Sequence, residues 1–284
     1  MGRWLWKSFF CFFILTCITG AQKILLERSR ASILDEKTCE SAAFREQHLP
    51  TELYRQLRNQ DESSGNTDWM ENLTTTMLNG KFYPGRCSSD REPYLRYKYK
   101  EYTDLCSFYQ AVWKDVRYFP VAADDISFED GWMEERSFGG ERVHEGCDLF
   151  GGCGAADFYP IISMADGSVE AVGWLPLGGY RIGIRSPSGG YFYYAHLSSY
   201  ERDWKEGDSI KAGEILGFMG DTGYGSEGTK GKFPVHLHLG IYIQTPYSRE
   251  MSVNPYWVLK AVQKKSESVY INYISMQKCA IMQK

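Results

Sequence analysis

Two histidines one residue apart are the first candidates for chemistry in this sequence. His236 and His238 belong to the stretch 235–243, in which apolar residues surround both imidazoles. A β-strand places residues i and i+2 on one face, so both rings should project in the same direction. Two ordinary, half-exposed strand histidines are the simpler interpretation if the pair stands alone.

His144 and Asp148 form a second candidate pair. Their spacing would make them neighbours on a helix, but Gly146 between them, with more glycines close behind, disfavours a helix. In an extended segment, residues i and i+4 also share a face, so these two side chains can converge on one ion. Glu145 and Cys147 should then point away, which makes them poor candidates for ligands.

His196 ends an aromatic segment, 190–196, and completes the set of candidates. Two histidines and one carboxylate, with an open position for water, are typical of a catalytic rather than a structural zinc site. Each histidine taken singly is more simply explained as an ordinary polar strand residue. Four of the five histidines fall in this part of the chain, however, and their joint pattern favours a metal site. The fifth, His48, is expected at the surface or in packing.

The composition is that of an ordinary globular protein. The chain has 284 residues, of which 15% are aromatic and 24% are charged. This length allows one large or two modest domains with a substantial core. The formal net charge of −4 argues against a nucleic-acid partner, because such a partner is usually bound by a basic surface.

Residues 1–21 have the layout of a secretory signal peptide. Arg3 and Lys7 flank an apolar run at 8–19, and small residues follow as far as Ala21. The run is too short for a comfortable membrane span of about 20 residues. We therefore expect cleavage near Ala21 and an exported chain without a stable membrane span. An uncleaved N-terminal anchor is the alternative.

The cysteines that remain after such a cleavage permit disulfides, which exported proteins commonly contain. They are Cys39, Cys87, Cys106, Cys147, Cys153 and Cys279, enough for up to three bridges. Cys147 and Cys153 are close enough in sequence to close a local loop. A local bridge or simple packing is a better interpretation of Cys147 than a cysteine nucleophile beside Asp148.

Residues 22–118 are expected to form a helical N-terminal extension. Apolar spacing predicts helices at 51–59, 68–78 and 104–116, with a loop at 61–66. Asn79 and Gly80 offer a left-handed cap to the second of these helices, and Pro120 follows the third. No residue in this region suggests chemistry.

From residue 119 to 260 the pattern changes to short β-rich segments separated by Gly and Pro turns. The predicted strands lie at 158–164, 168–174, 180–186, 190–196, 215–219 and 235–244. Regular short strands of this kind indicate a mainly β domain built as an antiparallel sandwich or barrel. A polar tail follows at 261–284, with a short apolar run near 270–274.

Three motifs, in this order along the chain, resemble the signature of the lysostaphin-type zinc endopeptidases, which are bacterial peptidoglycan hydrolases. They are His144-xxx-Asp148, Tyr194-Ala195-His196-Leu197 and His236-Leu237-His238. The glycine-rich stretch 211–223 also resembles the segment that precedes the last motif in that family. The resemblance covers about 119–256 and implies the family's compact antiparallel β architecture. It leaves the helical extension unexplained.

Carried over to this sequence, the resemblance implies one zinc ion per chain, held by His144, Asp148 and His238. It leaves His196 and His236 unligated beside the metal-bound water. A neutral histidine, with an unperturbed pKa of about 6.5, suits proton transfer there, so His236 is assigned as the general base. His196 would stabilise the oxyanion or pass the proton to the leaving amine. Some relatives have a tyrosine shortly before the first ligand, whereas residues 137–140 contain none.

The predicted function is a secreted zinc endopeptidase that cuts a cross-bridge or stem peptide of peptidoglycan in the cell wall. One alternative is a non-catalytic envelope scaffold or activator that keeps the fold and binds peptidoglycan or a protein partner. Another is a zinc peptidase with a protein substrate. All five positions of the signature are filled, which favours the enzyme. The sequence leaves open which bond is cut, the oligomeric state, and whether the extension covers the groove, holds the protein at the envelope or binds a partner.

Two segments near the motifs have simpler interpretations. The aromatic run 191–194 is expected to serve strand packing, with one or two rings lining the groove. The glycine-rich segment 223–228 is expected to be a mobile loop at the groove rim. It is a poor phosphate cradle, because the Lys-Ser/Thr pair and helix of a nucleotide loop do not follow it.

Overall fold

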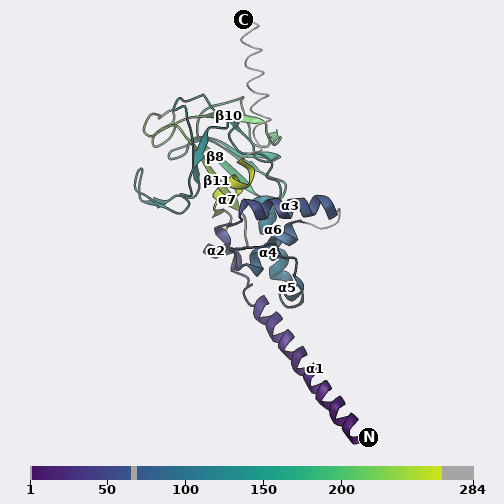
Figure 1. The fold of residues 1–284 in the computed structure, drawn as a ribbon. Helices are drawn as coiled ribbons and strands as arrows, with labels where there is room; N and C mark the ends of the chain where they lie inside the picture. Colours follow the sequence, from purple (N-terminus) through teal and green to yellow (C-terminus); the bar gives the residue numbers. More distant parts are fainter. Residues whose placement is uncertain (1, 65–68, 264–284) are drawn as a thin grey trace.

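The computed structural model describes residues 2–64 and 69–263. Figure 1 shows a long N-terminal helix that projects from the body, then a group of shorter helices, then a β-rich part. The helices are α1 (Gly2–Ala31), η1 (Thr38–Glu40), α2 (Ala42–Arg45), α3 (Thr51–Ser64), α4 (Trp69–Asn79), α5 (Glu92–Tyr97), α6 (Tyr99–Trp113) and α7 (Tyr256–Val262). The mainly β prediction with a helical N-terminal part is confirmed.

Helix α1 continues past the expected cleavage site near Ala21 as far as Ala31. Within the described ranges it contains the one segment, Trp6–Ala31, that could cross a membrane on length and composition, and its apolar stretch has no buried part. The expectation that the N-terminal apolar segment is too short to span was therefore wrong for this helix. A signal sequence and an anchor both have these properties.

The last turns of α1 dock onto the shorter helices. Ala31 is buried, and Glu27 accepts a hydrogen bond from Arg96 at the end of α5 (2.8 Å). Arg30 forms an ion pair with Asp90 (2.7 Å). A cleavage near residue 21 would leave these contacts intact.

The three helices expected from apolar spacing are present as α3, α4 and α6. The cap of α4 differs from the expectation: the residues with positive φ are Lys81 (51°) and Phe82 (69°), not Gly80. Gly80 is required for another reason, since a Cβ atom on it would lie 2.5 Å from Cα of Pro84. The loop expected at 61–66 is wrong for residues 61–64, which belong to α3, and residues 65 and 66 lie outside the described ranges.

The helical part and the sheet share one hydrophobic core. Arg45, which ends α2, donates hydrogen bonds to the carbonyl oxygen (3.0 Å) and hydroxyl (2.8 Å) of Ser252 in β12. The ring of His48 packs 4.0 Å from that of Trp257 in α7 and 5.1 Å from that of Tyr83. His48 therefore has a packing role, as expected.

Within the described ranges, ten strands form one antiparallel sheet with the path β1-β4-β11-β8-β7-β6-β9, to which β10, β5 and β12 are attached, and β2 and β3 form a separate hairpin. The strands are β1 (Ile126–Phe128), β2 (Glu135–Arg136), β3 (Arg142–Val143), β4 (Cys147–Gly151), β5 (Pro160–Ile162), β6 (Gly167–Leu175), β7 (Gly179–Arg185), β8 (Tyr191–Tyr200), β9 (Ser209–Ile210), β10 (Ile215–Met219), β11 (Leu237–Ile243) and β12 (Met251–Val253). All six predicted strands are present.

Side chains alternate between the two faces of the sheet, as the period of two requires. On β11, Leu237 and Leu239 are fully buried in the core, and His238 between them lies on the other face. On β8, Phe192 and Tyr194 are buried in the core. The aromatic run 191–194 therefore divides between core packing and the opposite face.

The expected local disulfide is absent from the described chain. Cys147 and Cys153 are both free thiols. Cys147 is fully buried and donates to the carbonyl oxygen of Glu129 (3.3 Å), so strand alternation turns it into the core, away from solvent. Burial raises the pKa of its thiol, which removes the basis for a nucleophile. Cys279 and the tail from residue 264, with its apolar run, lie outside the described ranges.

Candidate metal centre

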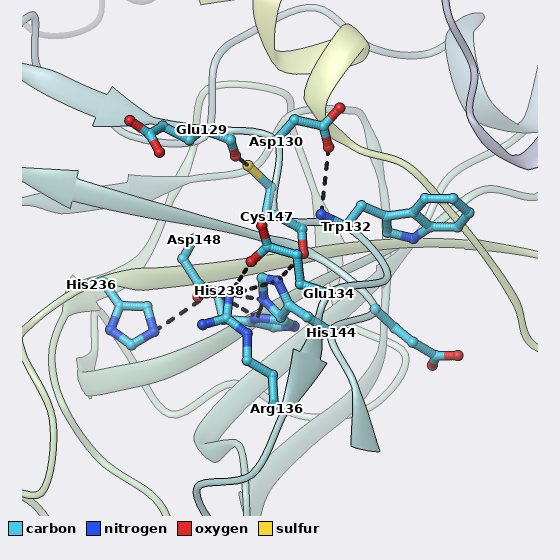
Figure 2. A network of polar contacts seen from close by, with 12 residues as sticks. Glu129, Asp130, Trp132, Glu134, Arg136, His144, Cys147, Asp148, His236 and His238 are labelled. Atoms are coloured by element: carbon cyan, nitrogen blue, oxygen red, sulfur yellow. Dashed lines mark hydrogen bonds and ion pairs between the residues drawn. The ribbon is translucent and has the colours of Figure 1, made fainter. Parts of the chain in front are cut away.

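Three side chains converge on one point at the edge of the sheet face opposite the core. Asp148 lies on β4 and His238 on β11, and the antiparallel register places these two residues directly opposite each other. His144 precedes β4. His144 Nε2 lies 3.0 Å from both Asp148 Oδ1 and His238 Nδ1, and the last two atoms are also 3.0 Å apart (Figure 2). The structure thus brings together the three residues that the sequence suggests as ligands.

This donor set fits a metal ion. Tetrahedral zinc with bonds of 2.0–2.1 Å holds its ligand atoms about 3.3 Å apart, close to the spacing found here. His144 Nδ1 donates to the carbonyl oxygen of Gly131 (2.8 Å), which leaves the lone pair on Nε2 facing the other two ligands. Three lone pairs directed at one another are unfavourable unless a cation or shared protons lie between them.

The ionisation state of Asp148 also fits a metal ligand. Burial by itself would raise the pKa of this carboxyl group, but the imidazoles of His144 and His238, each with a nitrogen 3.0 Å from its Oδ1, hold it well below its usual range. Asp148 is therefore ionised at neutral pH and available as an anionic ligand.

His236 lies beside this cluster without joining it. Its Nδ1 donates to the carbonyl oxygen of Pro234 (2.7 Å), so the lone pair is on Nε2, which lies 3.7 Å from Asp148 Oδ1. Phe150 stacks on the ring (5.1 Å between centroids). Burial is the main cause that lowers the pKa of His236, so the ring is neutral at pH 7 with its free nitrogen toward the cluster.

His196 has the same arrangement from another strand. Its Nδ1 donates to the carbonyl oxygen of Thr222 (2.8 Å), and its ring centroid lies 4.8 Å from that of His236 and 6.0 Å from that of His238. Burial, with a smaller contribution from the two neighbouring histidines, lowers the pKa of His196 to about 3. Both rings are therefore neutral at neutral pH, with Nε2 unprotonated.

A break in strand alternation turns His196 toward the cluster. In a regular strand, His196 would share the core face with Tyr194. Instead the register of β8 against β7 shifts at this point, and His196 has a φ of 62°. A β-bulge of this kind re-aims side chains next to functional sites. Leu197, the next residue, returns to the core.

Arg136 is a member of the site that the sequence pattern did not reveal. It lies on β2, and its Nη2 is 3.4 Å from Asp148 Oδ2 and 3.1 Å from His144 Nδ1 (Figure 2). A guanidinium at this position neutralises the carboxylate oxygen that faces away from the cluster. No local signal marks Arg136, because the hairpin reaches the site only through tertiary packing.

Tyr224 is a second residue that the motifs did not include. Its ring stacks on His196 (6.1 Å, with 21° between the planes), and its hydroxyl accepts a hydrogen bond from Arg142. Phe138 packs 4.8 Å from it. The segment 137–140 itself contains no tyrosine, but the glycine-rich loop supplies one to the same place.

The cluster opens into a groove with a volume of about 730 Å³. Tyr191, Tyr193 and Tyr242 line it from the sheet, so the outward-facing half of the aromatic run does reach the groove. Tyr224 lines it from segment 223–228, which therefore lies at the rim as expected. Among the described residues, none of the helical part 22–118 lines this groove.

Comparison with known proteins identifies the class. Residues 142–255, which contain the whole cluster, match the profile of Peptidase family M23. The crystal structure of a protein from Ruminococcus gnavus that carries the name glycyl-glycine endopeptidase lytM superimposes with a TM-score of 0.70 and 38% sequence identity, over 84% of this chain and 96% of that one. The chain therefore belongs to peptidase family M23.

Curated relatives are similar over less than half of this chain. L-Ala--D-Glu endopeptidase of Bacillus subtilis is 41% identical over 140 residues, which is 49% of this chain and 41% of that protein. Lysostaphin of Staphylococcus simulans is 31% identical over 121 residues, which is 42% of this chain and 22% of that protein. The chain thus covers less than half the length of each of these relatives.

Proposed function

We propose that this protein is an exported, zinc-dependent endopeptidase that hydrolyses peptide bonds in peptidoglycan. The observation that carries the proposal is the convergence of His144, Asp148 and His238 at 3.0 Å spacing, with Nε2 of His236 only 3.7 Å from Asp148 Oδ1. A three-ligand cluster beside two neutral imidazoles, at the base of an open groove, is what metal-assisted hydrolysis requires.

The five residues divide into two roles. His144 Nε2, Asp148 Oδ1 and His238 Nδ1 would hold the zinc ion, which would supply a water whose pKa is lowered to about 7. His236 accepts a proton on Nε2, because its Nδ1 proton is engaged by Pro234. Nε2 of His196 is also unprotonated, because its Nδ1 proton is engaged by Thr222, so His196 would have to accept a proton on Nε2 before it could stabilise the developing oxyanion or pass that proton to the leaving amine.

The names of the relatives support peptidoglycan peptides as the substrate class. One relative is named for the L-Ala--D-Glu bond and is 41% identical, and the lysostaphin match is 31% identical. The apolar segment Trp6–Ala31, near the N-terminus, supports export through a membrane, with either a cleaved signal or a retained anchor.

The proposal is tested by metal analysis and digestion of purified sacculi. The full chain should bind one zinc ion and release soluble muropeptides whose new termini identify the cut bond by mass spectrometry. His48→Gln is a matched control, because His48 lies outside the groove, and it should leave release unchanged. Binding to sacculi with zinc present but without any release would contradict the proposal and favour a non-catalytic scaffold.

A further inference from the structure

Arg181 lies in the same groove and has no task in the chemistry described so far. It belongs to β7 and alternates with Ile182, whose side chain is fully buried, so its own side chain is on the groove face. Its carbonyl oxygen accepts a hydrogen bond from the hydroxyl of Tyr200 (2.8 Å), which ties this part of β7 to β8. The side chain therefore projects from a fixed strand position.

Two of the three guanidinium nitrogens of Arg181 are unpaired among the described residues. Its Nε and Nη1 atoms are buried from solvent and have no hydrogen-bond partner in the part of the chain that the structure describes. The charge of Arg181 acts on the pKa of two tyrosines that line the groove, Tyr191 and Tyr193, and lowers it in both. Burying a guanidinium whose N–H groups have no acceptor reduces the stability of the fold, unless an anion accepts hydrogen bonds from those groups.

The other arginines near the groove are already engaged. Arg136 contacts the ligand Asp148, and Arg142 donates to Tyr224 and to a backbone carbonyl. Arg185, also on β7, forms a two-pronged pair with Glu170 (2.5 and 2.6 Å). Glu170 is thereby occupied.

The sheet register gives the distance between Arg181 and the metal ligand His238. His238 pairs with Ala195 on β8, and the bulge at 195–196 lies opposite Arg181 on β7. Two strand spacings, about 10 Å, therefore separate the backbones of His238 and Arg181. An extended peptide advances about 3.4 Å per residue, so this distance corresponds to about three residues of a bound substrate.

We infer that Arg181 binds a carboxylate of the substrate and selects acidic peptides, the class of the peptidoglycan stem, over uncharged glycine bridges. A guanidinium fork matches the two oxygens of a carboxylate, and this geometry is specific as well as strong. A stem peptide carries free carboxylates close to its peptide bonds, whereas a polyglycine bridge carries none. The inference rests on the proposed function and names the substrate of the same groove.

The test compares two peptides that differ in one group. A stem-type peptide with D-glutamate and its amidated counterpart with D-isoglutamine are digested by the zinc-loaded full chain, and kcat/KM is measured for each. We expect the acidic peptide to be preferred by about tenfold or more. Arg181→Gln should bring the ratio close to one, and Arg181→Lys should give an intermediate ratio.

Arg185→Gln is the matched control, since it makes the same change on the same strand at an arginine that Glu170 already occupies. It should leave the acid-to-amide ratio as in the unmodified protein. Zinc content and melting temperature of each variant show whether it has folded. If Arg181→Gln does not fold, the ratio of the unmodified protein still decides: a value near one overturns the inference.

Binding to the metal-free protein separates this inference from the proposed function. Calorimetry with the same two peptides should show a preference for the acid that Arg181→Gln removes. If that preference is found and no peptide is ever cut, the carboxylate site stands and the endopeptidase proposal fails. If peptides are cut at equal rates and bound equally well, the endopeptidase proposal stands and Arg181 has no such role.

Discussion

Gly146 lies directly against the imidazole of His238. A Cβ atom built on Gly146 would overlap Cε1 of that ring and would lie 2.6 Å from the carbonyl oxygen of Leu239. The absence of a side chain at position 146 is therefore what allows β4 and β11 to approach with a ligand on each. The glycine that disfavours a helix in the sequence is a steric requirement of the metal cluster.

Gly146→Ala should displace the His238 ring and weaken metal binding. We expect a loss of zinc affinity of about tenfold or more, with a matching fall in activity at limiting zinc, because misplaced ligands lose coordination geometry. A chelator competition titration measures the affinity. Gly154→Ala is the control, since a Cβ on Gly154 meets no atom within 4 Å. Equal zinc affinity in both variants would show that the contact is tolerated.

His238→Ala and His236→Ala should fail in different ways. His238→Ala removes one of three ligands, so bound zinc should fall well below one ion per chain. His236→Ala should keep its zinc and lose about 10²–10⁴-fold in kcat, the usual contribution of a general base. Metal content by mass spectrometry and initial rates separate the two. A His236→Ala variant with full activity would remove His236 from the mechanism.

Removing the metal should abolish hydrolysis while the fold persists. The ligands are at the groove face, and the core beneath them contains buried residues such as Leu237 and Leu239, so circular dichroism should change little. Zinc at about 100 times its dissociation constant should restore activity and add about 2.7 kcal/mol to the free energy of unfolding. Full activity after complete removal of zinc would contradict a metal-dependent reaction.

Glu46 should make stability depend on pH. Burial, and to a lesser extent the charge of Asp130, raises the pKa of Glu46 above its unfolded value, so its favourable contribution is present at low pH and is lost as pH rises through the folded pKa. Its Oε1 accepts from Asn254 (3.2 Å) and Trp257 (3.3 Å), and an amide oxygen can accept both bonds. Glu46→Gln should therefore be more stable than the unmodified protein at pH 7.

The advantage of Glu46→Gln should shrink as pH falls toward the unfolded glutamate pKa, near 4.3. Melting temperatures of both proteins across pH 4–8 give the difference directly. Glu40→Gln is an exposed control that should show no such trend. An advantage that grows as the solution becomes more acidic would reverse the sign and refute the assignment.

Strand positions could be predicted because the period of two is a local property. The faces of β11 follow from alternation alone, and so do the core positions Phe192 and Tyr194 on β8. Helix ends were harder to predict, because α3 continues to Ser64 and the positive φ angles after α4 belong to Lys81 and Phe82. These ends depend on the contacts that the following residues make.

His196 shows where alternation fails. The regular pattern would bury it beside Tyr194, and only the bulge and the φ of 62° turn it toward the groove.

The disulfide prediction failed for a related reason. Proximity in sequence suggested a bridge between Cys147 and Cys153, but the strand places the side chain of Cys147 in the core.

By itself the sequence determined the local pairs, His144 with Asp148 and His236 with His238, because each pair lies within one extended segment whose geometry its own backbone sets. Only the tertiary structure decided that the two pairs meet, through the register of β4 against β11. Arg136, Tyr224 and Arg181 come from other elements: a hairpin, a loop and a third strand. The packing of the whole core selects which of these segments lie side by side, and no short stretch of sequence carries that information.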